Sequence, residues 1–295
     1  MTGFRTVPKA VAGSVFAAIL TISAGLPDAS AADVAVDLEL ALAVDVSRSV
    51  DDEEAALQRS GYIKAFRHPS IIDAISQGPL GRIAVTYFEW AGYARVRPVV
   101  AWRVISDRAS AEAFVRALEA DEPEQGRRTS ISGAIEFGAA SFENNGFTAR
   151  RRVIDISGDG ANNSGELVTE ARDRAVKAGI TINGLPIVNG RPTFSGWPQA
   201  ENLDLFYRDC VIGGPGAFYV VARNFEDFPR AVLRKLMLEI AGLTPPQPPQ
   251  RLLWHAQMKP QRQAPPCDIG EQRRRQRWGD SGDDDFYPVP PRFRR

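Results

Sequence analysis

The chain has 295 residues, enough for one large domain or two small ones. Hydrophobic residues make up 44% of it and charged residues 24%, an ordinary globular composition that excludes a wholly disordered chain. The 36 basic and 36 acidic residues balance, so the charge gives no indication of a nucleic-acid partner.

Residues 1–31 have the pattern of a secretory signal peptide. A short basic region precedes an apolar stretch over 10–26, and Ala29-Ser30-Ala31 supplies a cleavage site of the A-x-A type. We expect cleavage after Ala31 and a periplasmic or secreted mature protein without stable membrane insertion. The alternative is an uncleaved anchor, which is disfavoured because the apolar stretch is short and contains glycine and serine.

The first buried strand of the mature chain ends in a cluster of oxygen-bearing side chains. Residues 40–44 are apolar throughout, as in a parallel strand covered on both faces. Asp45, Ser47 and Ser49 follow at alternate positions, and the acidic run 51–54 then opens a helix. Oxygen side chains at the carboxyl end of a strand, facing a helix N-terminus, are typical of ligand sites in open α/β sheets.

Helix and strand patterns alternate along the rest of the domain. Helices are expected at 52–77 with a break at Pro69, 107–120, 129–144, 165–178 and 225–240, and strands at 82–91, 94–105, 152–156, 180–188 and 217–222. Only two residues separate 82–91 from 94–105, so these strands should form an antiparallel hairpin. Residues 189–216 show no regular pattern. The alternation predicts one α/β domain over 36–242 with a mainly parallel sheet covered on both faces.

Residues 243–295 differ in composition from the domain. They contain proline clusters, the basic run Arg273-Arg274-Arg275 and the acidic run Asp283-Asp284-Asp285, which predicts a largely disordered extension. Cys210 and Cys267 are the only cysteines. In an oxidising compartment they can pair and tie the extension to the domain. The alternative is one buried and one exposed free thiol.

Two later segments also place oxygen atoms at loop or strand ends. Thr129 opens a helix after a polar loop, and Asp159 lies between two glycines after the strand 152–156. With the first segment they give two carboxylates and three hydroxyls, and oxygen ligands are what a hard cation of the Mg²⁺ type prefers. Each has a simpler interpretation as well: Ser49 and Thr129 as helix caps and Asp159 as a turn residue.

The segments DVSRS (45–49), TSISGAI (129–135) and SGDG (157–160) resemble the three parts of the metal-ion-dependent adhesion site, or MIDAS, of von Willebrand factor A-type (vWA) domains. In that pattern DxSxS is joined by a threonine on a second loop and an aspartate on a third. One departure is Gly158, which stands where a threonine often precedes the aspartate.

This resemblance implies a three-layer, doubly wound, Rossmann-like vWA fold with one antiparallel edge strand. It also implies a cation, Mg²⁺ or else Mn²⁺ or Ca²⁺, with an open position for an Asp or Glu of a protein partner. The implied ligands are Asp45, Ser47, Ser49, Thr129 and Asp159. More narrowly, stretches 78–92 and 202–218 resemble a bacterial family of exported proteins known as domain of unknown function 1194.

We therefore expect an exported, cation-dependent protein-binding module without catalysis; the alternatives are a metal-dependent hydrolase and a metal-free scaffold. A phosphatase with an aspartate nucleophile usually has a second carboxylate where Ser47 stands. A serine hydrolase needs G-x-S-x-G and a histidine base, and neither His68 nor His255 is placed as one. No glycine-rich nucleotide loop follows the first strand. These observations argue against an enzyme and leave the scaffold open.

Overall fold

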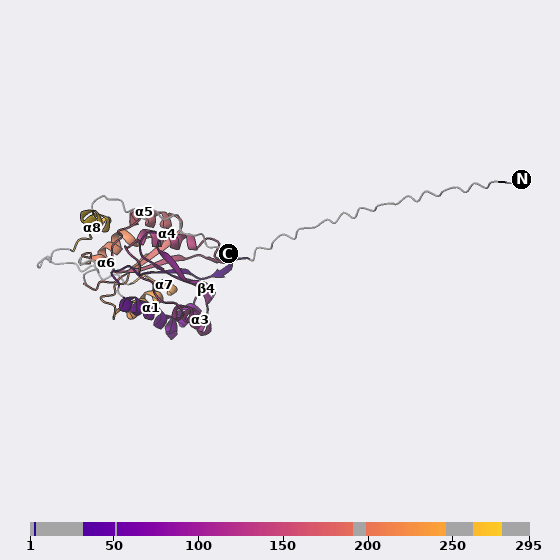
Figure 1. Ribbon diagram of the computed structural model, residues 1–295. Helices are drawn as coiled ribbons and strands as arrows, with labels where there is room; N and C mark the ends of the chain where they lie inside the picture. The colour runs from indigo at the N-terminus through magenta and orange to yellow at the C-terminus, as the bar shows by residue number, and fades with distance from the viewer. Residues whose placement is uncertain (1–2, 4–31, 51, 191–198, 246–261, 279–295) are drawn as a thin grey trace. The chain divides into compact units, whose positions relative to one another are not determined.

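The apolar strand that ends at Asp45 lies at the centre of a five-stranded sheet of order β4-β3-β2-β6-β7 (Figure 1). The structure, a computed structural model, describes residues 3, 32–50, 52–190, 199–245 and 262–278. The strands are β2 (Glu39–Asp45), β3 (Ile83–Trp90), β4 (Val96–Ile105), β6 (Arg152–Gly158) and β7 (Ile180–Pro186). All pair in parallel except β4, which is antiparallel to β3 at the edge, so the predicted sheet is confirmed.

Helices cover both faces of this sheet because β2 carries apolar side chains on both sides. Leu40, Leu42 and Val44 face one core, and Ala41 and Ala43 face the other. The first core is completed by α1 (Asp52–Arg67), α2 (Pro69–Ser76), α3 (Arg108–Glu119) and α7 (Phe228–Ala241). The second is completed by α4 (Ile131–Ser141), α5 (Val168–Lys177), α6 (Leu203–Phe206) and the π-helix η1 (Tyr207–Val211). The three-layer arrangement is thus confirmed.

Some elements differ from those predicted. Residues 217–222 pair with the β7 segment only through isolated bridges, Gly184 to Tyr219 and Ile187 to Ala222, rather than as a regular strand. The stretch 189–216 contains α6 and η1, whose short helical turns are too brief to give a periodic pattern. A small two-stranded parallel sheet of β1 (Val34–Val36) and β5 (Phe147–Ala149) was also not predicted.

Part of the C-terminal extension is structured. A disulfide joins Cys210 of η1 to Cys267, with the Cα atoms 5.4 Å apart, and α8 (Ile269–Trp278) follows it. Composition predicted disorder here, but the cross-link lowers the entropy lost on ordering, and Glu271 accepts a hydrogen bond from Asn162 at 2.7 Å. No helix in the described part of the chain is long and apolar enough to span a membrane. The predicted signal peptide and the remainder of the extension lie outside the described residues.

Candidate metal centre at the carboxyl end of the sheet

Asp45 and Asp159 meet because they end neighbouring parallel strands. Asp45 is the last residue of β2, and Asp159 directly follows β6. The register pairs Val44 with Ser157, so both aspartates lie at the same edge of the sheet. Parallel strands place their carboxyl ends together, and this is the edge at which open α/β sheets bind ligands.

A chain of short polar contacts links the five predicted ligands. Ser47 donates its backbone N–H to Asp45 Oδ1 at 2.7 Å, and the hydroxyls of Ser47 and Ser49 lie 3.1 Å apart. Ser49 donates to Asp159 Oδ1 at 2.6 Å, and Thr129 Oγ1 lies 3.4 Å from Ser47 Oγ. Four of the side chains are buried and Ser49 is half-buried. The Ser49 hydroxyl therefore faces the site.

Thr129 is free to face the site because its neighbour caps the helix. The N-cap of α4 is Ser130, whose hydroxyl accepts the backbone N–H of Gly133 at 3.1 Å. Asn163 then fixes the Thr129 backbone in both directions: its Oδ1 accepts from Thr129 N at 2.9 Å, and its N–H donates to Thr129 O at 2.8 Å. The loop after Asp159 thus positions the threonine.

Close approach explains the glycine before Asp159 but not the one after it. A Cβ atom at Gly158 would lie 2.8 Å from Asp45 Oδ2, closer than real Cβ contacts, and 3.0 Å from the Tyr207 hydroxyl, tighter than most of them. At Gly160 a Cβ would lie 3.4 Å from Thr129 Oγ1, which is an ordinary contact. The glycine at 158, where the vWA pattern often has threonine, is therefore required by the space that Asp45 and Tyr207 occupy here.

The two aspartates have no cationic partner in the described part of the chain. Among the described residues, neither Asp45 nor Asp159 forms an ion pair, and the buried Oδ2 of Asp45 has no hydrogen-bond partner. Burial, followed by the charge of Asp159, raises the pKa of Asp45 well above its usual range. Burial raises the pKa of Asp159 to about 6; the hydrogen bond from Ser49 opposes this shift and the charge of Glu54 adds to it.

These residues fit a hard divalent cation. An orphaned buried carboxylate oxygen, a second carboxylate and three neutral hydroxyls form an all-oxygen donor set, and a cation there would offset the cost of burying two like charges. In the described part of the chain, the strand-end site included, no group of three or more His, Cys, Asp or Glu side chains is placed to hold a metal; the site itself has two carboxylates. His68 accepts the N–H of Ser70 as the N-cap of α2.

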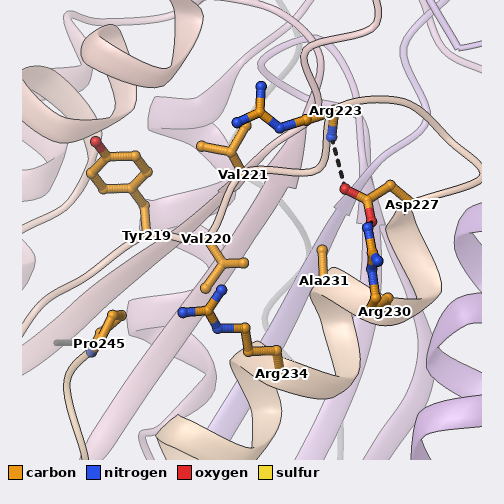
Figure 2. A pocket seen from close by; sticks show the side chains of 9 residues that line it. All are labelled: Tyr219, Val220, Val221, Arg223, Asp227, Arg230, Ala231, Arg234 and Pro245. Carbon is orange, nitrogen blue, oxygen red and sulfur yellow. Dashed lines mark hydrogen bonds and ion pairs between the residues drawn. The ribbon is translucent and has the colours of Figure 1, made fainter. Parts of the chain in front are cut away.

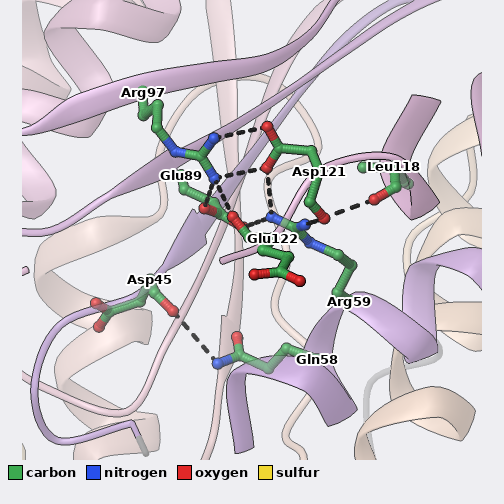
Figure 3. A network of polar contacts seen from close by, with 8 residues as sticks. All are labelled: Asp45, Gln58, Arg59, Glu89, Arg97, Leu118, Asp121 and Glu122. Carbon is green, nitrogen blue, oxygen red and sulfur yellow. Dashed lines mark hydrogen bonds and ion pairs between the residues drawn. The ribbon is translucent and has the colours of Figure 1, made fainter. Parts of the chain in front are cut away.

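Several residues around the site could not be anticipated from the motif. Gln58 donates to the backbone oxygen of Asp45 at 3.3 Å (Figure 3), and Gln199 donates to that of Asp159 at 2.8 Å. Tyr207 reaches the space beside Gly158 from η1, and its buried hydroxyl has no hydrogen-bond partner. Asn162 accepts from Ser132 N at 3.0 Å and connects the loop to the tail. These contacts join distant parts of the chain and leave no local sequence signal.

The sheet order, the antiparallel edge strand and the strand-end site define a domain of the von Willebrand factor A type. The pilus adhesin SpaC from Lactobacillus rhamnosus GG shares this fold, with 14% identity over 70% of this chain and 30% of that chain and a TM-score of 0.51. The proximal thread matrix protein 1 of the mussel byssus, "with zinc occupied MIDAS motif", matches at 14% identity, 70% and 47% coverage and a TM-score of 0.49. A von Willebrand factor type A protein from Catenulispora acidiphila matches at 13% identity, 70% and 42% coverage and a TM-score of 0.45.

The chain itself belongs to the family described as "Protein of unknown function (DUF1194)", whose family model matches residues 35–244. This confirms the narrower resemblance. No curated protein matches the chain. In each of the three structures above, the chain corresponds to less than half of the other protein's length.

Proposed function

We propose that this protein is an exported protein-binding module that takes up a divalent cation, and that the cation receives an acidic group of a partner. The cation would be Mg²⁺, or else Mn²⁺ or Ca²⁺, held by the five strand-end residues. The observation that carries the proposal is the buried Asp45 Oδ2, which has no partner among the described residues and lies beside three hydroxyls and a second carboxylate.

The protein's own residues have separate roles in this proposal. Asp45 and Asp159 supply the negative charge, while Ser47, Ser49 and Thr129 supply neutral oxygen atoms. When bound, the cation would supply a positive charge with a coordination position that a carboxylate can fill. Neutral hydroxyls leave that charge less fully compensated than a ring of carboxylates would, which favours an anionic outside ligand. Neither histidine nor thiol belongs to the described site, so the proposal includes no reaction.

Export is the second part of the proposal. Its support is the signal-peptide pattern of residues 1–31 together with the disulfide between Cys210 and Cys267, since disulfides persist in oxidising compartments such as the periplasm. The partner is then a periplasmic or extracellular protein that presents an aspartate or glutamate side chain.

Crosslinked capture from a periplasmic extract tests the proposal. The mature chain is immobilised and exposed to extract with Mg²⁺ or with a chelator, next to Asp45→Ala and to Asp73→Asn as a control on the exposed surface of α2. We expect a discrete protein to be captured by the wild type and by Asp73→Asn, and to be lost with chelator and with Asp45→Ala. Identical capture under all four conditions would contradict a cation-dependent binding module.

A further inference from the structure

A second feature of the chain lies at the outer edge of the sheet, next to β7. Residues 217–222 run alongside β7. Their backbone hydrogen bonds to β7 and to Val188 are made by Phe218, Val220 and Ala222. Their side chains are buried in the core that faces α7. The segment thus continues the sheet by one extended stretch and leaves its other side as the edge.

The backbone groups on that outer side have no hydrogen-bond partner among the described residues. Alternate residues of an extended chain point their N–H and C=O groups to opposite sides, so those of Tyr219 and Val221 point away from β7. In the described part of the chain, no hydrogen bond reaches the backbone of either residue. Such an edge is a template for pairing with another strand, and proteins usually cover or protect it.

A surface pocket of about 490 Å³ lies between this edge and α7 (Figure 2). Arginines dominate its charged lining: Arg223 and Arg234 form no ion pair with any described residue, and Arg230 is paired with Asp227 at 2.5 Å. Arg223 donates its backbone N–H to Asp227 Oδ2 at 3.3 Å, and its side chain lies near Val221 (Figure 2). The pocket therefore combines backbone groups and arginine side chains that have no partner among the described residues.

We propose that this pocket binds an extended acidic segment of a partner protein, which adds a strand at Tyr219 and Val221 and places carboxylates on Arg223 and Arg234. Strand addition supplies affinity through main-chain hydrogen bonds, while side-chain pockets supply selectivity. Arginine suits the second part, since its planar fork binds carboxylates in two hydrogen bonds. The pocket shares no residue with the metal centre, so this inference goes beyond the proposed function and does not depend on it.

The competing interpretation is that the arginines only protect the edge, because charged side chains are a common means of preventing strand pairing. The two interpretations differ in what they predict for an acidic strand. A protective cluster repels or ignores every added strand, whereas a docking site accepts a strand of opposite charge and rejects one of like charge.

Fluorescence anisotropy with a labelled, end-blocked peptide of alternating valine and glutamate tests the proposal on the full chain. We expect saturable binding, and binding at least roughly tenfold weaker for the lysine version of the peptide and for Arg234→Glu. A valine–glutamate peptide with N-methylated amides keeps its charge but cannot pair, so it too should bind at least tenfold more weakly. Arg108→Glu, on the exposed start of α3, is the matched control and should bind as the wild type does.

Chelator should leave this binding unchanged, which separates the result from the metal centre. Absence of binding of the acidic peptide at millimolar concentration would overturn the proposal, and equal binding of the N-methylated peptide would overturn strand addition. Binding that appears only when the acidic run Asp283-Asp284-Asp285 is replaced by asparagine would assign the pocket to the chain's own tail and would also overturn it.

Discussion

Glu89 and Asp45 are buried carboxylates on neighbouring strands, one residue apart in register, and their surroundings differ in charge. Glu89 on β3 is opposite Val44, the residue before Asp45. It is paired with Arg59 and, at 2.6 Å, with Arg97, and Asp121 joins both arginines (Figure 3). Asp45 is equally buried but contacts a backbone N–H and hydroxyl-bearing neighbours.

The difference shows where the fold supplies its own positive charge. A buried carboxylate without a cation is costly, and Glu89 avoids that cost through two guanidinium groups. Asp155 lies on β6, the strand before Asp159, and its Oδ1 is 2.6 Å from Nζ of Lys235. Among the described contacts, Asp45 accepts a backbone N–H and Asp159 accepts a hydroxyl, and neither has a cationic side chain as a partner. The charge missing from this edge of the sheet is what a divalent cation would bring.

The largest expected effect on stability comes from the ion pairs of Glu89. Arg59→Met removes one guanidinium from buried Glu89 and should lower the free energy of unfolding by about 3–5 kcal/mol, because it leaves a buried charge incompletely paired. Arg67→Met is the matched control: Arg67 also contacts two carboxylates, Glu112 and Glu119, but its side chain is 43% exposed. It should cost less than about 1 kcal/mol in urea unfolding. Equal losses for the two variants would contradict the role assigned to burial.

Removing a carboxylate should change the free energy of unfolding in opposite directions in the two regions. In chelator, Asp159→Asn should raise the free energy of unfolding by about 1–2 kcal/mol, because it removes an ionised group that lacks a cation. Glu89→Gln should lower it, because the buried Arg59 loses its buried carboxylate partner and keeps only Asp121. Thermal unfolding of both variants in chelator measures this. A destabilised Asp159→Asn protein would show that the site is already electrostatically satisfied without metal.

The pH dependence sharpens the same contrast. The pKa of Asp159 is raised to about 6, so the folded metal-free protein binds protons more tightly than the unfolded chain does. Its stability should therefore increase as the pH falls from neutral through about 6, and a saturating cation should abolish this increase because it binds the ionised carboxylates. Glu239, whose pKa burial raises to about 7, adds a similar trend, so the difference between wild type and Asp159→Asn isolates the site. A stability difference between wild type and Asp159→Asn that has the same pH dependence with and without cation would contradict this prediction.

The smallest expected effect concerns the tail. Glu271 of α8 holds Asn162, the second residue after Gly160, while the disulfide anchors α8 close to η1, which carries Tyr207. Reduction of the disulfide, or Glu271→Ala, should lower cation affinity by a few-fold, up to about tenfold, because supporting residues orient the ligands. Titration of cation with and without reductant measures the effect. An unchanged affinity would show that the tail is attached to the loop without influencing it.

The strand-end residues could be predicted because their signals are local. A fully apolar strand, alternating oxygen side chains and glycines beside Asp159 each follow from neighbouring positions, and parallel topology then brings Asp45 and Asp159 together. The sequence also indicated the break at Pro69 and the antiparallel hairpin.

What escaped prediction depends on contacts between distant residues. Ser130 rather than Thr129 caps α4, and only the three-dimensional position of Asn163 explains how Thr129 is held. The helix α8 forms in a segment whose composition favours disorder, because a disulfide and a buried hydrogen bond hold it. The extended stretch at 217–222 forms isolated bridges instead of a strand, and this leaves the arginine-lined edge.

Calorimetric titration of the mature chain with Mg²⁺, Mn²⁺ and Ca²⁺ tests the central claim most directly. We predict binding of one cation per chain at or below millimolar concentration, loss of that binding in Asp45→Ala, and unchanged binding in Asp73→Asn, whose side chain is exposed on α2. No binding above background up to the millimolar range, or binding that Asp45→Ala leaves intact, would contradict a metal centre at the carboxyl end of β2.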